Sequence, residues 1–337
     1  MTRPETAPDR PASPLWAVTS FYNPAGYRRR KANYLLFRER LALPLLAVEW
    51  SPTGEFELRP GDADLLIQLH GGDVMWQKER LLNIGVARLP AECTHVAWLD
   101  CDLVFEREDL GEATLAALDA APLVQLYDRV AYLARTPLDA LARLGNCTSG
   151  TVSFEREGAA AAYATAARRG RPAPAVPVAT EHPGDFARMP SVGFAWAARR
   201  ELLERHPLFD EWIVGGGDSA YFHAAAGSPE RVVENHGLAS PHRDQFLPRA
   251  RELAHAIDGR IGHVPGRVYT LWHGDFADRC YRSRHSILAR HGFDPRRFLR
   301  RSPSDVWEWS DASHGLPDEI RAYFEQRKED GLITSRG

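Results

Sequence analysis

The sequence predicts an α/β fold in which a mostly parallel sheet is covered by helices on both faces. Two observations lead to this prediction. Several short runs of apolar residues lack polar alternation, and stretches between them repeat apolar residues at helical spacing. Continuous apolar runs are typical of strands that are buried on both faces. Because strands and helices alternate along the chain, we expect a three-layer α/β/α domain.

The expected elements follow one another from residue 15 onward. The first strand is expected at Leu15–Phe21, where Asn23 and Pro24 end the apolar run, and a basic helix is expected at Tyr27–Leu41. Further strands are expected at Leu45–Val48, Leu65–Leu69, Val96–Leu99, Leu123–Tyr127 and Val192–Ala197. Further helices are expected at Trp76–Leu89, Glu108–Ala120, Arg199–His206 and Phe276–His291.

Three segments show no clear periodic pattern. Residues 1–14 are rich in proline and charge, which favours a flexible tail. Residues 168–190 are rich in proline and glycine and are expected to form a long surface loop. Residues 227–265 are polar, and we expect a lid or an insertion beside the ligand site. The main domain should span residues 15–300, followed by a C-terminal helical appendage at 301–337.

The composition argues against several classes of protein. The chain has 337 residues and a formal net charge of −3, so neither nucleic acid nor an acidic membrane is an expected partner. The four cysteines are not spaced as in metal sites, which favours a reduced compartment. No apolar run approaches the roughly 18 residues of a membrane span, and the N-terminus lacks a signal-peptide core. A soluble, cytoplasmic protein is therefore expected.

The clearest chemical feature is a pair of aspartates, Asp100 and Asp102, directly after the predicted strand Val96–Leu99. Side chains two residues apart in extended backbone point to the same side, and ligands of open α/β sheets bind beyond the carboxyl ends of the strands. Mg²⁺ and Mn²⁺ prefer carboxylate oxygens and usually bind together with substrate phosphates. Such a site can neutralise a diphosphate leaving group. The alternative is a solvated turn, where aspartate is common.

Motifs on both sides of this pair resemble those of the β-1,4-galactosyltransferase family, which are inverting glycosyltransferases. The shared order is a basic helix ending in Leu-Leu-Asn-x-Gly, an Asp-x-Asp strand end, a further strand, a Gly-Gly-x-Asp loop and a late histidine. The corresponding segments are Gly72–Gly85, Asp100–Asp102, Phe194–Ala197, Trp212–Asp218 and Tyr269–Asp275. The resemblance covers roughly residues 15–290 and implies the GT-A (Rossmann-like) nucleotide-diphospho-sugar transferase fold. It implies a donor half at about 15–130 and an acceptor half at about 131–300.

The resemblance also implies roles for individual residues. Asp102 and His273 correspond to the ligands of a Mn²⁺ or Mg²⁺ ion, with Asp100 beside them or facing donor hydroxyls. Asp218 corresponds to the general base that deprotonates the acceptor. Taken alone, His273 would be a packed or surface histidine, and Asp218 the N-cap of a following helix. The other implied donor-binding residues are Lys78, Tyr22, Asn23 and Arg279. The implied acceptor-binding residues are Trp212, Gly216 and Gly217.

Some positions depart from the family pattern. Tyr22 and Pro24 stand where the family has arginine in its first-strand loop. Gly217 replaces an acidic residue and Val214 replaces a tryptophan, and both positions shape the family's acceptor site. The identities of the donor sugar and the acceptor are therefore not transferred from the family.

Together these features predict a metal-dependent glycosyltransferase that inverts the anomeric centre. Its expected substrates are a nucleotide-sugar donor, expected to be a UDP-sugar, and a hydroxyl group on a glycan or small molecule. Two alternatives share the fold. One is a retaining glycosyltransferase, because Asp-x-Asp serves both stereochemical classes. The other is a sugar-nucleotide-binding protein or nucleotidyltransferase.

Overall fold

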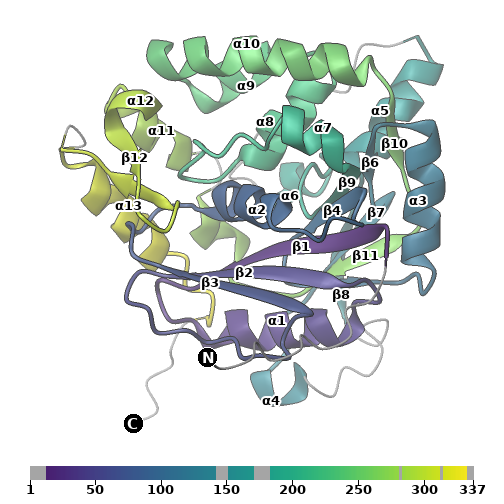
Figure 1. Cartoon of the computed structure of the whole chain (residues 1–337), viewed down its shortest axis with the longest axis horizontal. Helices are drawn as coiled ribbons and strands as arrows, with labels where there is room; N and C mark the ends of the chain where they lie inside the picture. Colours follow the sequence, from purple (N-terminus) through teal and green to yellow (C-terminus); the bar gives the residue numbers. More distant parts are fainter. Residues whose placement is uncertain (1–12, 142–150, 171–182, 281–282, 312–313, 332–337) are drawn as a thin grey trace, which may run out of the picture.

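A seven-stranded sheet forms the centre of the molecule (Figure 1). The computed structural model describes residues 13–141, 151–170, 183–280, 283–311 and 314–331. In spatial order the strands are β10 (Ile261–His263), β6 (Leu123–Gln125), β9 (Ala195–Arg199), β4 (His95–Leu99), β1 (Leu15–Tyr22), β2 (Leu45–Ser51) and β3 (Leu65–His70). β1 pairs in parallel with β2 and with β4, and β2 pairs in parallel with β3. In contrast, β9 runs antiparallel to both β4 and β6. The predicted mixed α/β fold with a central, largely parallel sheet is confirmed.

The apolar runs of the strands arise because both faces of the sheet are buried. In β1, Trp16 and Val18 belong to one hydrophobic core, whereas Leu15 and Ala17 belong to the other. Helix α2 (Lys78–Ala87) packs on the first face, and helix α1 (Arg28–Arg40) covers the second (Figure 1). Helix α3 (Leu110–Ala120) also packs its apolar side into the second core.

A second sheet positions the late histidine. Its strands are, in spatial order, β5 (Leu103–Phe105), β11 (Arg267–Thr270), β7 (Arg129–Leu133) and β8 (Val152–Glu157). β11 pairs antiparallel with β5, and Thr270 lies opposite Leu103. The Leu271 amide continues this pairing by donating a hydrogen bond to the Asp102 carbonyl over 2.9 Å. The chain after β11 therefore passes beside the aspartate pair that follows β4.

Residues 227–265 form regular structure, which their polar, weakly patterned sequence did not indicate. Their role as a lid or an insertion stays a prediction. They contain helix α9 (Glu230–His236), the long helix α10 (Ser240–Ile257) and the edge strand β10. Helix α10 packs on helix α8 (Gly217–Ala225). Its apolar side consists of Phe246, Ala250, Leu253 and Ile257, which are buried at helical spacing.

The proline- and glycine-rich region holds more structure than expected. Helix α5 (Ala159–Arg168) precedes it, and the short helix α6 (Pro183–Phe186) lies within it. Residues 171–182 of the expected surface loop lie outside the described residues, as do residues 1–12 of the expected tail. The remaining short helices of this half are α4 (Leu138–Leu141) and α7 (Arg200–Arg205).

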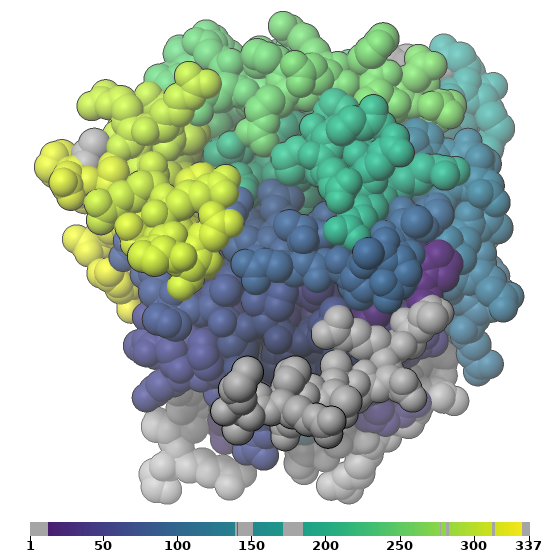
Figure 2. All heavy atoms as spheres, in the orientation of Figure 1, coloured from purple at the N-terminus to yellow at the C-terminus, as the bar shows by residue number. Residues whose placement is uncertain are grey.

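The C-terminal region packs into the main body of the protein. The helix expected at Phe276–His291 is divided into a 3₁₀ helix, η2 (Phe276–Arg279), and α11 (Ser283–Arg290). The elements that follow are α12 (Pro295–Phe298), β12 (Leu299–Arg301), β13 (Trp307–Trp309) and α13 (Leu316–Glu325). Ile320 and Phe324 of α13 belong to the same core as α2. Figure 2 shows the C-terminal residues, in yellow, directly against the blue and green parts of the chain.

Among the described helices, none combines the length and the apolar character that a membrane span requires.

Candidate functional site

Two adjoining cavities lie beyond the carboxyl ends of the parallel strands β1 and β4. The larger cavity has a volume of about 170 Å³ and the smaller one about 90 Å³. Five residues line both cavities and form the shared wall: Trp76, Lys78, Asp100, His273 and Arg327. This position matches the place where ligands of open α/β sheets bind.

Lys78 contacts two aspartates of the site, Asp100 and Asp218. It lies in the first turn of α2, and its Nζ is 2.6 Å from Oδ1 of Asp100 and 2.8 Å from Oδ2 of Asp218. Burial alone would lower the pKa of Lys78, but the two carboxylates raise it well above its ordinary value. Lys78, predicted as a donor-binding residue, therefore holds Asp100 and Asp218 together in this structure.

Glu79 is a buried acid that the sequence did not single out. Burial raises the pKa of Glu79 to about 8, although the neighbouring Lys78 opposes the shift. Its Oε1 atom has no hydrogen-bond partner among the described residues. The space for this carboxyl group exists because position 217 is a glycine, since a Cβ atom there would lie 2.3 Å from Oε1. Burial likewise raises the pKa of Asp100, to about 6.

Asp102 and His273 contact each other at the smaller cavity. Nδ1 of His273 lies 2.8 Å from Oδ2 of Asp102 and 2.9 Å from the Leu271 carbonyl oxygen. Burial would raise the pKa of Asp102, but His273 and then Arg279 hold it below its ordinary value. Both partners of Nδ1 accept hydrogen bonds, so Nδ1 carries the hydrogen and Nε2 of a neutral ring keeps a free lone pair.

These two side chains fit a metal ion that is held jointly with a substrate. Oδ1 of Asp102 is buried without a hydrogen-bond partner among the described residues, and Nε2 of His273 has a free lone pair. Within the described part of the chain, no three His, Cys, Asp or Glu side chains form a metal-binding group. A cation here would therefore take its remaining ligands from substrate phosphate or water. Asp100, the third predicted ligand, is bound to Lys78 instead.

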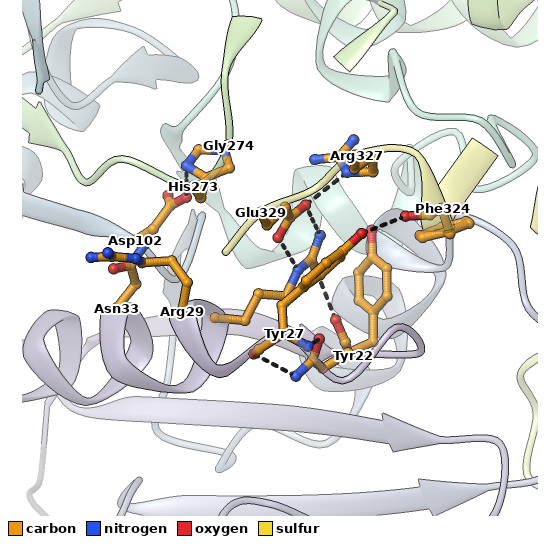
Figure 3. A network of polar contacts seen from close by, with 12 residues as sticks. Tyr22, Tyr27, Arg29, Asn33, Asp102, His273, Gly274, Phe324, Arg327 and Glu329 are labelled. Atoms are coloured by element: carbon orange, nitrogen blue, oxygen red, sulfur yellow. Dashed lines mark hydrogen bonds and ion pairs between the residues drawn. The ribbon is translucent and has the colours of Figure 1, made fainter. Parts of the chain in front are cut away.

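A largely buried charge network lines the smaller cavity (Figure 3). The carboxylate of Glu329 accepts hydrogen bonds from Nε and Nη2 of Arg30 over 2.5 and 2.8 Å, and from Nε of Arg327 over 2.7 Å. Burial would raise the pKa of Glu329, but Arg30 and Arg327 hold it well below its ordinary value. These three residues were not predicted, and they add two cations and one anion to the cavity wall.

Further contacts fix this C-terminal segment in place. The Tyr27 hydroxyl donates to the Phe324 carbonyl over 3.0 Å, and the Lys328 amide donates to the same hydroxyl over 3.1 Å. Gly274 has φ +100°, and a Cβ atom there would lie 2.9 Å from the Arg327 carbonyl oxygen. Only glycine therefore allows the segment to pass so closely behind His273.

The larger cavity has an aromatic wall and a polar wall. Tyr132 and Phe186 form the aromatic side, and the guanidinium carbon of Arg156 lies 3.9 Å from the Phe186 ring centre. The polar side comes mainly from the loop and helices around Asp218. It consists of Asp218, Ser219, His236, Arg284 and His285. A mixture of apolar surface and a few polar groups is typical of small-molecule sites.

Of the other predicted site residues, some line the two cavities and some do not. Tyr22 lines the smaller cavity, and Arg279 and Gly216 line the larger one. Asn23 is not among the described residues that line either cavity, and its amide donates to the Tyr27 carbonyl and to Glu57. The remaining two predicted residues lie behind the larger cavity. Gly217 packs against Glu79, and Trp212 is buried with its indole bonded to His236.

Comparisons with known proteins give distant likenesses to solved structures. No protein-family model matches the chain, and no curated protein matches it. TarS from S. aureus is 12% identical over 82% of this chain and 41% of its own chain, with a TM-score of 0.34. This chain therefore spans about two fifths of TarS.

Two other solved structures are similarly distant. A 4-diphosphocytidyl-2C-methyl-D-erythritol synthase from Anaerococcus prevotii is 12% identical, over 75% of this chain and 86% of its own, with a TM-score of 0.28. A mannose-1-phosphate geranyltransferase from Thermus thermophilus is 13% identical, over 77% of this chain and 74% of its own, with a TM-score of 0.27. None of these likenesses identifies a family.

Proposed function

We propose that this protein is a GT-A glycosyltransferase that moves a sugar from a UDP-sugar to a hydroxyl acceptor, with inversion and with Mn²⁺ or Mg²⁺. The observation that supports this most is the pair of cavities with a shared wall. Asp102 lines the smaller cavity and Asp218 lines the larger one, while Lys78 and Asp100 lie between them. Group transfer needs such adjacent sites, with leaving-group charge handled in one and the nucleophile deprotonated in the other.

The charge of the smaller cavity supports a role for a divalent cation. The cations that line it are Arg30, Lys78 and Arg327, and the carboxylates are Asp100, Asp102 and Glu329. The lining is therefore formally neutral when histidine is neutral. Because the charges of these residues cancel one another, no net positive charge is left to balance the negative charge of a nucleotide diphosphate. Asp102 and His273 would hold a divalent ion, which would supply the missing positive charge as a Lewis acid.

Asp218 is the proposed general base on the side of the larger cavity. It lies in the first turn of α8, after Gly215 and Gly216, whose φ angles of +84° and +102° favour glycine. Lys78 holds one carboxylate oxygen of Asp218, which fixes the direction of the other. In the proposed step this carboxylate takes the acceptor proton. The acceptor oxygen bonds to the anomeric carbon, and the bond to the diphosphate oxygen breaks on the opposite side.

A transfer assay tests this proposal. UDP-, GDP- and TDP-sugars are incubated with Mn²⁺ and a panel of alkyl glycosides, and the products are identified by mass spectrometry and NMR. We expect an inverted glycosidic product from one donor, and a loss of about 10²-fold or more in kcat for Asp218→Asn. Unchanged turnover of Asp218→Asn contradicts the base assignment. A product with retained configuration contradicts the inverting mechanism.

A further inference from the structure

His236, the last residue of α9, already accepts a hydrogen bond at one of its ring nitrogens. The indole Nε1 of Trp212 donates a hydrogen bond to Nδ1 of His236 over 2.9 Å. An indole N–H can only donate, so Nδ1 must hold a lone pair. Burial, and then the charge of Arg284, lowers the pKa of His236 well below its ordinary value. The ring is therefore neutral, and its hydrogen is on Nε2.

The Nε2–H group of His236 has no hydrogen-bond partner among the described residues. The side chain is nearly inaccessible, since His236 is only 3% exposed. Buried N–H groups are nearly always hydrogen-bonded in folded proteins, so an unpartnered one calls for an explanation. Its position beside the larger cavity offers that explanation.

The Cε1 edge of the His236 ring, which lies between Nδ1 and Nε2, is turned toward the loop before Asp218. A Cβ atom at Gly216 would lie 2.9 Å from Cε1 of His236, which is bonded to Nε2, and 2.7 Å from Cε1 of His285. The His285 ring lies parallel to the His236 ring, with centres 3.7 Å apart and planes 8° apart. The in-plane N–H of His236 therefore does not point at His285. His236, His285 and Gly216 all line the larger cavity.

We propose that His236 is a substrate-binding residue that donates a hydrogen bond from Nε2 to an oxygen atom of the acceptor. Trp212 fixes the tautomer that makes this possible, and the glycine at position 216 leaves room for the Cε1 edge of the ring. The inference rests on the proposed function, in which the larger cavity holds the acceptor. It specifies an acceptor that carries a second oxygen atom near the reacting hydroxyl, as sugars do.

A second buried histidine provides a matched control. His242 also packs against Trp212, with ring centres 4.7 Å apart, and its Nε2 likewise has no partner among the described residues. It is 1% exposed, but it is not one of the described residues that line the larger cavity. Replacing His242 therefore removes a similar buried ring without removing a group from the cavity.

The tautomer is tested by NMR on protein labelled with ¹⁵N-histidine. Two-bond correlations at pH 7 should show a neutral His236 ring with hydrogen on Nε2. In Trp212→Phe this preference should weaken, because Nδ1 loses its donor. An imidazolium, or a hydrogen on Nδ1 in the wild type, overturns the proposal without reference to any activity.

Acceptor kinetics test the substrate contact with monosaccharides and alkyl glycosides as probes. His236→Asn keeps a side-chain oxygen for Trp212 but has no donor at the place of Nε2, whereas His236→Gln can place an amide N–H near it. We expect the acceptor KM to rise about tenfold or more in His236→Asn, and less in His236→Gln. The donor KM, and both KM values of His242→Asn, should stay within about twofold of wild type.

The outcomes separate this inference from the proposed function. Transfer by the wild type together with an unchanged acceptor KM in His236→Asn overturns the role of His236 alone. If the wild type transfers sugar to none of the probes, the proposed function fails, and the assignment of an acceptor to His236 fails with it.

Discussion

The ammonium nitrogen of Lys78 lies 2.8 Å from Oδ2 of Asp218, and this contact fixes a residue of the larger cavity to the wall that both cavities share. The same nitrogen lies 2.6 Å from Oδ1 of Asp100. Because Lys78 is only 6% exposed, its charge and those of its partners depend on one another. The two sides of the proposed active site are thus coupled through one side chain.

Replacing Lys78 should therefore cost both stability and activity. Lys78→Met leaves Asp100 and Asp218 without their cation, and we expect the free energy of unfolding at pH 7 to fall by about 3–5 kcal/mol. Lys31→Met is the control, because Lys31 is partly exposed and donates to the Glu57 carbonyl. Its expected loss is about 1 kcal/mol or less. Equal losses in urea unfolding of the two variants would contradict the coupling.

Glu79 should make stability depend on pH in the neutral range. Its pKa rises from 4.5 to about 8 on folding, so the folded chain binds this proton more tightly than the unfolded chain does. That contribution is fully present below pH 4.5 and is lost as the pH rises through 8. The free energy of unfolding should fall by at most about 1.4 kcal/mol per pH unit from this group.

Glu79→Gln isolates this effect. Asp100, with a pKa of about 6, changes stability in the same direction at lower pH, so the comparison is most informative between pH 6.5 and 8. Over that interval wild type should lose more stability than Glu79→Gln in urea titrations. Parallel pH profiles for the two proteins would show that Glu79 is ionised in the folded state.

A glycine at position 217 should be important for stability only because the Glu79 side chain is present. In Gly217→Ala the new methyl carbon would lie 2.3 Å from Oε1 of Glu79, and we expect a loss of about 1–3 kcal/mol. In a Glu79→Ala background most of this loss should disappear. Gly111→Ala in α3 is the control, since its nearest neighbour is a Leu43 methyl group at 3.1 Å. Additive effects of the Glu79 and Gly217 substitutions in a double-mutant cycle would contradict the contact.

The network at Glu329 should contribute far more to the free energy of unfolding than an exposed ion pair does. Glu329→Ala leaves the buried Arg327 and the partly buried Arg30 without their carboxylate, and we expect a loss of about 3–5 kcal/mol. Asp318→Ala is the control. It removes a pair with Arg321 whose side chains are 84% and 54% exposed, and it should cost about 1 kcal/mol or less. Chemical denaturation distinguishes the two, and a loss at Glu329 as small as that at Asp318 would argue against a buried network.

The strands were predictable because a strand that is buried on both faces consists of a continuous run of apolar residues. The apolar runs at residues 15–21 and 45–48 became β1 and β2, which supply both cores. Helix α10 was not predicted, because charged residues and Pro248 interrupt its apolar positions. Its four buried apolar residues are recognisable only when the helix is seen against α8.

The candidate site was predictable only where the residues lie in local motifs. Asp102, Asp218 and His273 follow from such motifs, and the structure brings them to the two cavities. Their catalytic and metal-binding roles remain predictions. Arg30 and Glu329 were missed because 299 positions separate them and no local pattern links such residues.

Glu79 left a weaker signal that was overlooked. It lies three residues before Leu82 and seven before Val86, and all three side chains are buried in the structure. A charged residue on the apolar side of an amphipathic helix is unusual, because burying an unpaired charge is costly. Such a position, next to a lysine, is a reason to suspect a functional acid.

The proposed donor site is tested most directly by thermal melts of wild type and Asp102→Ala with nucleoside diphosphates, each with and without Mn²⁺. A ligand that binds only the folded state raises the apparent melting temperature. We predict a rise with UDP plus Mn²⁺ in the wild type, loss of that rise in Asp102→Ala, and its persistence in a variant of the exposed Asp119. No shift with any nucleoside diphosphate, or an undiminished shift in Asp102→Ala, would contradict the proposed donor site.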